Sequence, residues 1–341
     1  MTKSKNEPYG VILSCKGLHL TKQEVTFFSK INPFGFILFS RNFKSKKQLV
    51  ELIKSLKTVS INQAPLIFVD QEGGRVQRFK NNEFIKYPPQ KFFGDIYNVD
   101  KKRAEKLSYI NARLIAYELK EVGVDVNCSP VLDVFFQNGD EIIGNRSFSS
   151  DPEIVTTLAK SYCEGFRDGG ILPVIKHFPG HGRANVDSHI DLPIISESLE
   201  DLEKIDLVPF RSLKSENLLM VAHILYDNID QKIAPYSKKL MTSLLEESIK
   251  FNGLIISDDL SMLALKGSII ERTKNCFKGG CDIVLYCSGK IDEMIEIYDY
   301  CDEINKKKFE YFKKCMKKIN VKNINIEQYL NELNESGAFN L

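Results

Sequence analysis

Residues 253–259 are GLIISDD, three adjacent apolar side chains followed by a serine and two aspartates. A strand that is covered on both faces has this near-continuous apolar character, because helices shield one face and packed side chains the other. A segment with helical spacing follows it, and the same pair of features recurs seven times. The further runs are YGVILSC (9–15), GFILF (35–39), LIFVD (66–70), VDVN (124–127), LPVIKH (172–177), LLMVAH (218–223) and CDIVLY (281–286).

Helix-start signals lie between these runs. A serine, threonine or aspartate that precedes an acidic residue or glutamine at capping distance marks the first turn of a helix, and proline is favoured directly after the cap. The pairs are Thr21 with Glu24, Ser45 with Gln48, Ser198 with Asp201, and Asp151 followed by Pro152 and Glu153.

Eight strand–helix units without a Pro/Gly-rich linker predict one closed (β/α)8 barrel of the TIM type, spanning residues 1–341 as a single domain. An open, doubly wound sheet is the alternative. From about residue 301 to 341 the chain is Lys-rich and helical, and we interpret it as a final covering helix and tail whose charged residues form a solvated face.

The composition is that of a globular protein, and its nearly balanced charge fits a small neutral or locally anionic substrate better than a polyanion. Lys and Arg number 47 against 45 Asp and Glu, which gives no electrostatic reason to expect a nucleic acid or an anionic membrane. The N-terminus lacks an apolar signal segment, and no apolar run of about 18 residues occurs. The eight cysteines form no CxxC pair, so we expect buried, reduced thiols in a cytoplasmic protein.

Polar residues follow the predicted strands where a barrel carries its active site. The carboxyl ends of barrel strands and the loops after them form this face. The residues in question are Asp70, Asn127, Lys176, His177, His223, Asp258 and Asp259.

The two adjacent aspartates of GLIISDD cannot share one direction, because successive side chains of a strand diverge. Asp258 directly ends the strand and is the predicted functional carboxylate. For Asp259 two interpretations stay open: a role in the site, or the N-cap of a helix that begins with LSMLAL.

The segment DQEGGRVQR (70–78) combines a carboxylate with two guanidinium groups around Gly73 and Gly74. Such glycines permit close approach of the backbone to a ligand. Asp70 with Arg75 and Arg78 can bind vicinal hydroxyls or a carboxylated substrate. A purely structural ion pair of Asp70 with one arginine is the alternative.

Two further cations are predicted at the same face. Arg146 lies in GNRSFSSDPE on a loop before a helix, and Lys176 ends the fifth apolar run. Together they could hold sugar hydroxyls or an anionic group.

The segment KHFPGHGRANVDSHIDLP (176–193) holds three of the five histidines. A metal site is disfavoured, because HxxxH pairs suit a helix and Pro179 and Gly180 interrupt it here. Ser188 as a nucleophile is also disfavoured, because no GxSxG elbow is present.

General acid/base chemistry suits this segment better. Asp187 and His189 are two residues apart and can lie on one side of an extended loop, where the carboxylate would orient the imidazole and raise its pKa toward neutrality. We interpret His177 as a ligand-binding residue and His181 as a loop-packing residue.

Taken together and in this order, GFILFSRN, DQEGGRVQR, KHFPGHG…DSH and GLIISDDLSM resemble bacterial β-N-acetylhexosaminidases of glycoside hydrolase family 3, from about Gly10 to Gly289. The resemblance implies that Asp258 is the nucleophile, His189 the acid/base and Asp187 its partner. It also implies that the N-acetylglucosamine unit is bound by Asp70, Arg78, Arg146, Lys176 and His177.

The resemblance further implies a lone barrel without metal or other cofactor. The expected activity is that of a retaining exo-β-N-acetylglucosaminidase acting on anhydromuramyl fragments during peptidoglycan recycling in the cytoplasm. Two departures from the family pattern are Arg183, where an acidic residue is usual, and Glu246 with Ser248 in the helix before GLIISDD. We expect both to lie away from the chemistry.

Alternative functions are another family 3 β-glycosidase or glycoside phosphorylase, a metal-dependent barrel hydrolase, an aldolase-like enzyme with Lys176 as Schiff base, and a non-catalytic sugar-binding barrel. The expected partner is a saccharide substrate, with no nucleic acid and no membrane. The sequence leaves the oligomeric state open, and a monomer is favoured. The sequence leaves the aglycone open, because loops form the leaving-group pocket.

Overall fold

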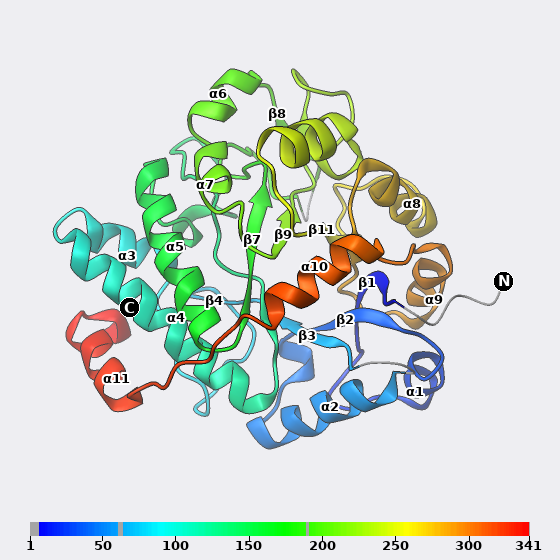
Figure 1. The fold of residues 1–341 in the computed structure, drawn as a ribbon, viewed down its shortest axis with the longest axis horizontal. Coiled ribbons are helices and arrows are strands. Elements are labelled where there is room, and N and C mark those ends of the chain that lie inside the picture. Colours follow the sequence, from blue (N-terminus) through cyan, green and yellow to red (C-terminus); the bar gives the residue numbers. More distant parts are fainter. Residues whose placement is uncertain (1–6, 61–63, 189–190, 341) are drawn as a thin grey trace.

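Eight parallel strands form a closed barrel at the centre of the molecule (Figure 1). The computed structural model describes residues 7–60, 64–188 and 191–340. Around the barrel the strands are β1 (Tyr9–Ser14), β2 (Pro33–Leu38), β3 (Leu66–Val69), β6 (Val126–Asn127), β7 (Leu172–Phe178), β9 (Leu218–Val221), β11 (Leu254–Asp259) and β12 (Ile283–Leu285). Pairing of β1 with β12 closes the ring. The predicted strands and barrel are confirmed, and the open sheet is wrong.

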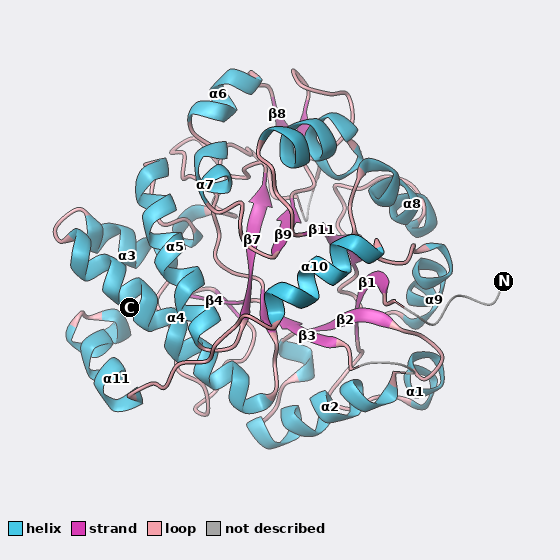
Figure 2. Ribbon diagram, viewed as in Figure 1, coloured by secondary structure: helices cyan, strands magenta, loops and turns pink. Residues whose placement is uncertain are grey.

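Helices surround the barrel and connect its strands (Figure 2). They are α1 (Lys22–Phe28), α2 (Lys46–Val59), α3 (Gln90–Tyr97), α4 (Lys101–Val122), α5 (Pro152–Asp168), α6 (Leu199–Lys204), α7 (Leu207–Ser212), the π-helix η4 (Lys239–Ser248), α8 (Ile269–Gly279), α9 (Ile291–Tyr300), α10 (Lys306–Met316) and α11 (Ile326–Glu335). Short 3-10 turns are η1 (Ser40–Asn42), η2 (Gly144–Arg146), η3 (Ala234–Tyr236) and η5 (Ala338–Asn340). Every helix within the described residues is too short or too polar to cross a membrane.

The predicted helix starts are confirmed. The side chains of Thr21, Ser45, Asp151 and Ser198 each accept a backbone N–H at the start of α1, α2, α5 and α6. Of the two interpretations of Asp259, the N-cap of a helix that begins with LSMLAL is wrong, because residues 260–265 form turns and α8 begins at Ile269. Ser268 caps α8 in a reciprocal box with Glu271.

Alternation of side chains explains why each strand is apolar throughout. In β1, Val11 and Leu13 belong to the core between barrel and helices, whereas Ile12 packs inside the barrel. In β11, Ile255 faces the helices and Ile256 the interior. Burial of such a side chain contributes about 2 kcal/mol, so the two faces of every strand favour the closed barrel.

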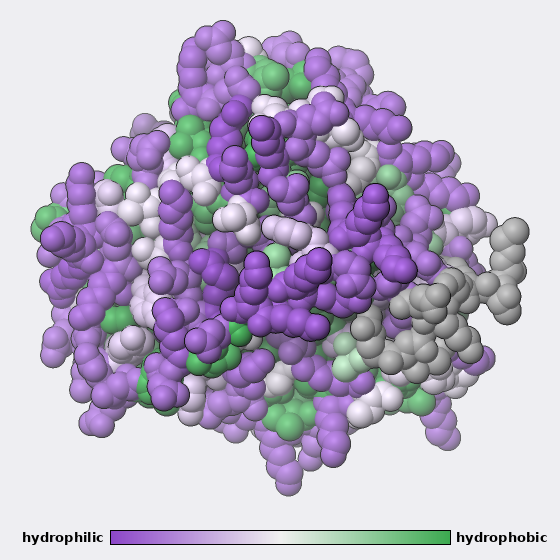
Figure 3. Space-filling model, viewed as in Figure 1, coloured by the Kyte–Doolittle hydropathy of each residue, from purple (hydrophilic) through white to green (hydrophobic). Residues whose placement is uncertain are grey.

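Helix α10 lies across one opening of the barrel (Figure 1). Its Phe309 and Phe312 join the interior core, with ring centroids 6.5 and 5.5 Å from that of Phe34 at the start of β2. Its outer face is hydrophilic, as Figure 3 shows. The solvated face is thus confirmed, but the predicted single helix is two, since α11 follows and packs on α4.

Candidate active site

A cavity of about 430 Å³ opens at the carboxyl ends of the strands. Among the described residues that line it are Phe39, Asp70, Glu72, Arg75, Arg78, Ile142, Arg146, Lys176, His177, His181, Asp187, Ser188, Met220, Asp258, Asp259 and Cys287. The cavity therefore brings together seven of the predicted site residues. His189, the predicted acid/base, lies outside the described residues.

Asp70 follows β3 and is paired with two cations. Its Oδ1 lies 3.0 Å from the Nζ of Lys176, and its Oδ2 lies 3.1 Å from a guanidinium nitrogen of Arg78. Burial favours the neutral acid, but the Lys176 and Arg78 charges outweigh burial and hold the pKa of Asp70 well below its usual value. The structural ion pair with an arginine is thus present, inside the cavity.

Glu72, which was not among the residues predicted from the sequence, extends these pairs to Arg146. Arg146 donates from Nε and Nη2 to the two Glu72 oxygens, both at 2.8 Å, while Lys176 Nζ lies 2.6 Å from Glu72 Oε1. Burial opposes ionisation of Glu72, yet Arg146 and Lys176 lower its pKa to about 2. The proximity of Glu72 to Asp70 in DQEGG was the available signal.

These five groups, Asp70, Glu72, Arg78, Arg146 and Lys176, form a charge network that lines the cavity. Lys176 also keeps its charge, because Asp70 and Glu72 outweigh burial and raise its pKa. A Schiff base requires a neutral amine, so the aldolase-like alternative is disfavoured. Three cations face two carboxylates, and the excess positive charge lies beside donors and acceptors suited to sugar hydroxyls.

His177 is oriented by Asp133, a second residue that was not among those predicted from the sequence. His177 Nδ1 lies 2.6 Å from Asp133 Oδ2, and the backbone N–H of His181 donates to Oδ1 at 2.7 Å. Burial opposes ionisation, but His177 lowers the pKa of Asp133, which therefore accepts from Nδ1–H and leaves Nε2 for the cavity. Lys176 and His177 both line the cavity, and the peptide bond between them is cis.

The two aspartates at the end of β11 have different partners. Asp259 accepts hydrogen bonds from the backbone N–H groups of Ser261 and Cys287, both at 3.0 Å, and from the Ser261 hydroxyl. It therefore holds the loops after β11 and β12 together rather than capping a helix. Asp258 Oδ1 accepts the backbone N–H of Asp259 at 2.8 Å, and Asp258 lines the same cavity as Asp187.

Other residues predicted near the site have structural contacts. Asn127 pairs its side-chain amide with both backbone groups of Gln71 at 2.9 Å. The close approach at Gly73 is to protein and not to a ligand, because an added Cβ would lie 2.3 Å from the Pro88 carbonyl oxygen. Arg75 donates to the Ile142 carbonyl at 2.6 Å.

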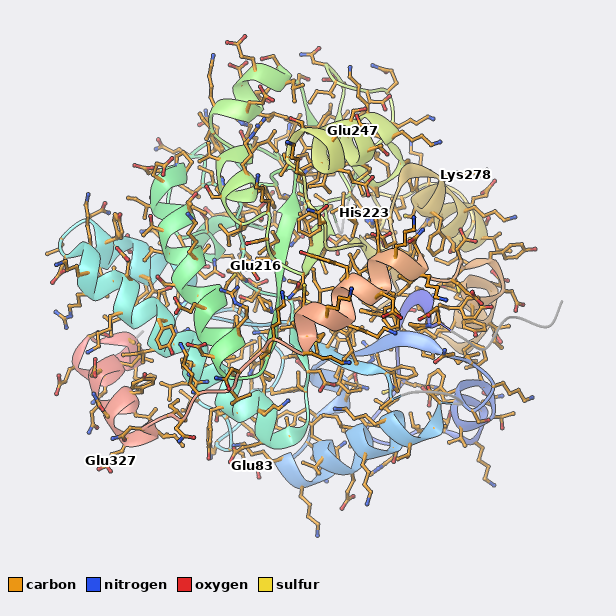
Figure 4. The ribbon with its side chains drawn as sticks, in the orientation of Figure 1. Glu83, Glu216, His223, Glu247, Lys278 and Glu327 are labelled. Atoms are coloured by element: carbon orange, nitrogen blue, oxygen red, sulfur yellow. The ribbon has the colours of Figure 1, made fainter. Side chains whose placement is uncertain are left out.

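His223 lies inside the ring of helices (Figure 4), and its side chain is fully buried. Of the other labelled residues in that view, Glu83, Glu247, Lys278 and Glu327 lie toward its rim. No three His, Cys, Asp or Glu side chains within 7–60, 64–188 and 191–340 are placed to hold a metal ion.

Comparison with known proteins defines the family. Residues 14–328 match the glycosyl hydrolase family 3 N-terminal domain. The chain belongs to glycosyl hydrolase family 3. The motif resemblance noted in the sequence is thereby confirmed, and this family 3 protein is a glycoside hydrolase.

The family 3 chain is similar to curated bacterial enzymes along most of its length. It is 39% identical over 287 residues to the β-hexosaminidase of Nitrosomonas eutropha, which covers 82% of this chain and 80% of that relative. The β-hexosaminidase of Methylobacillus flagellatus is 36% identical over 292 residues, or 84% of this chain and 82% of its own.

A solved structure extends the likeness to the whole fold of the family 3 chain. NagZ from Neisseria gonorrhoeae, crystallised with N-trifluoroacetyl-D-glucosamine, has a TM-score of 0.85 and 34% identity. The alignment covers 98% of this chain and 97% of that chain. The relative's ligand is an N-acylated glucosamine.

Proposed function

We propose that this family 3 hydrolase is a retaining exo-β-N-acetylglucosaminidase. The observation that carries the proposal is one cavity containing Asp258, Asp187 and the charge network with His177. A volume of about 430 Å³ suits a single sugar residue with room for its leaving group. Similarity to β-hexosaminidases and to a NagZ crystallised with an N-acylated glucosamine supports the substrate class.

Each side chain has a role in this proposal. The hydroxyl and acetamido groups of the non-reducing N-acetylglucosamine bind Asp70, Arg78, Arg146, Lys176 and His177. The network is charged before substrate arrives, so its dipoles and ions need little reorganisation. Glu72 and Asp133 do not act on the sugar directly but orient the groups that do.

The reaction proceeds in two displacements at C1. The Asp258 carboxylate attacks the anomeric carbon while His189, protonated and oriented by Asp187, gives its proton to the departing glycosidic oxygen. Neutral His189 then takes a proton from water as the water oxygen attacks C1 and releases Asp258. The product keeps the β configuration, and both residues return to their initial protonation states.

Substitution and trapping test the proposal together. We expect Asp258→Ala to lower kcat by at least about 1,000-fold on the nitrophenyl β-N-acetylglucosaminide while sugar binding is retained. His189→Ala should harm unactivated glycosides more than the nitrophenyl one, because only the former need a proton on the leaving oxygen. A 5-fluoro sugar should leave a covalent adduct on Asp258, detected by mass spectrometry.

Glucoside and xyloside versions of the nitrophenyl substrate are the specificity controls. An adduct on Asp259, or equal turnover of all three sugars, would contradict the proposal. Repeating the assay with inorganic phosphate separates hydrolysis from phosphorolysis by the identity of the product.

The proposed natural substrate is a muropeptide fragment that carries N-acetylglucosamine on an anhydromuramyl aglycone. A cytoplasmic location belongs to the same proposal, since eight free thiols suit a reducing compartment. Competition between anhydromuropeptide and chitobiose in one reaction would test the aglycone, and preference for chitobiose would contradict it.

A further inference from the structure

Ser188 connects the two sides of the cavity. It follows Asp187 directly and is only 2% exposed. Its Oγ lies 3.3 Å from His181 Nε2, and its carbonyl oxygen accepts the backbone N–H of Ala264 at 3.3 Å. Ala264 belongs to the turns after β11, so Ser188 ties the segment that carries Asp187 to the segment that follows Asp258.

His181 offers Ser188 a fixed partner. The backbone N–H of His181 is bound by Asp133, and its ring packs at 5.7 Å against the ring of His177. Burial, together with the nearby His177, lowers the pKa of His181 to about 4, so its ring is neutral at working pH. A neutral imidazole has one donor and one acceptor, and a serine hydroxyl matches either.

The segment before Ser188 has other anchors: Arg183 donates to Asp206 Oδ2 at 2.9 Å, and the Asp187 carbonyl accepts the backbone N–H of Asp191 at 3.1 Å. Ala184 is buried, and its carbonyl accepts the backbone N–H of Asp140 at 2.7 Å. Asn185 is exposed, and the chain from there to Asp187 has no regular secondary structure. The ties at Ser188 therefore add to those of the segment itself in placing Asp187, and they are the ones that reach the loop after β11.

We propose that Ser188 and His181 are positioning residues, and that their contact sets where Asp187 lies relative to Asp258. The inference rests on the proposed function, in which Asp187 orients the acid that protonates the leaving group. Neither side chain needs to touch the reacting atoms. Because Asp133 binds both His177 and His181, the same carboxylate supports the sugar-binding histidine and this contact.

The test compares two leaving groups through kcat/KM, which reports the step in which the acid acts. We expect Ser188→Ala to lower kcat/KM by about 10-fold for diacetylchitobiose, which needs the proton, and by no more than about 2-fold for the nitrophenyl glycoside. Ser188→Thr keeps the hydroxyl and should restore the chitobiose value. His181→Gln, whose amide can replace Nε2, should be milder than His181→Leu.

Ser196→Ala is the matched control, because Ser196 lies on the same connection but its hydroxyl donates to Asp227 at 3.0 Å. It should change neither substrate. Equal losses on both substrates, or no rescue by Ser188→Thr, would overturn the inference. If Ser188→Ala does not fold, kcat/KM of Ser188→Cys is compared on the same two substrates. A wild type inactive on both glycosides would instead refute the proposed function.

Discussion

At the scale of single residues, Glu72 shows how the site holds several buried charges together. Its side chain is 2% exposed and forms ion pairs with both Arg146 and Lys176. Lys176 also forms an ion pair with Asp70. A buried charge is tolerated when its partners are close and in good geometry. The network therefore stabilises the fold and the binding surface at once, and removal of one carboxylate leaves cations uncompensated.

Glu72→Gln should lower the free energy of unfolding by about 3 kcal/mol, because it leaves Arg146 and Lys176 short of one negative charge. It should also raise KM for the nitrophenyl N-acetylglucosaminide. Urea unfolding and steady-state kinetics measure the two effects. Glu200→Gln is the control, since its pair with Lys204 is exposed, and it should change neither. Similar behaviour of both variants would argue against a buried role for Glu72.

At the scale of elements, Arg183 attaches the connection after β7 to the helices beside it. Its Nε donates to Asp206 Oδ2 at 2.9 Å and its Nη1 to Glu197 Oε1 at 3.1 Å, next to the starts of α7 and α6. Its guanidinium also lies 4.0 Å from the ring centroid of Phe136. The departure at Arg183 thus has a structural partner in the buried Asp206. The other departure, Glu246, pairs with Lys308 at 2.6 Å.

Arg183→Ala should destabilise the fold by about 3 kcal/mol at pH 7, because it leaves the buried Asp206 carboxylate unpaired. The loss should be smaller in an Asp206→Asn background, which a double-mutant cycle of urea unfolding measures. Equal losses in the two backgrounds would disprove the coupling.

The same variant should have a characteristic pH dependence. Burial, only partly offset by Arg183, raises the pKa of Asp206 to about 6. Since this lies above the unfolded value of about 3.9, the folded state binds the proton more tightly, and protonation stabilises it as the pH falls through 6. Arg183 lowers this pKa, so without it the Asp206 carboxyl takes up its proton at a higher pH, and the variant gains more stability than the wild type does. The difference in free energy of unfolding between wild type and Arg183→Ala should therefore shrink between pH 7 and pH 5. A deficit that grows over that range would contradict this explanation.

At the scale of the whole molecule, the two ends of the barrel have different tasks. The carboxyl ends of the strands hold the charged cavity, and the opposite opening is filled by the aromatic side of α10. Phe309 and Phe312 pack on Phe34 inside the barrel, so a helix from the C-terminal part of the chain completes the interior core. The residues that stabilise the barrel at one end therefore lie apart from the active-site residues at the other, so a substitution at one end should have little effect on the other.

Phe312→Ala should lower the free energy of unfolding by about 3 kcal/mol, because it leaves a cavity where a buried ring fills the barrel opening. Its kcat at 25 °C should stay close to the wild-type value. Tyr311→Ala, at an exposed position of the same helix, is the control and should be nearly neutral. Loss of kcat in folded Phe312→Ala would show that the two ends are coupled.

Much of the architecture and part of the site were predictable. Asp70, Lys176, His177 and Asp258 were found because each ends a strand, and parallel strands in a barrel present their ends on one face. The role of Asp259 could not be predicted from the sequence. Its hydrogen-bond donors Ser261 and Cys287 come from two different loops, and holding these loops together is a role that only those contacts reveal. The turns at LSMLAL likewise involve a contact between loops, because the backbone N–H of Ala264 donates to the carbonyl of Ser188.

The sequence by itself determined the number of barrel strands, their order along the chain and the polar groups at their ends, because alternation and burial act within a few residues. Only the tertiary structure decided that Glu72 joins Arg146 to Lys176, that Asp133 orients His177, and that α10 fills the far opening. These pairings join residues remote in the chain. Their energies depend on distance and burial in three dimensions, which no local pattern encodes.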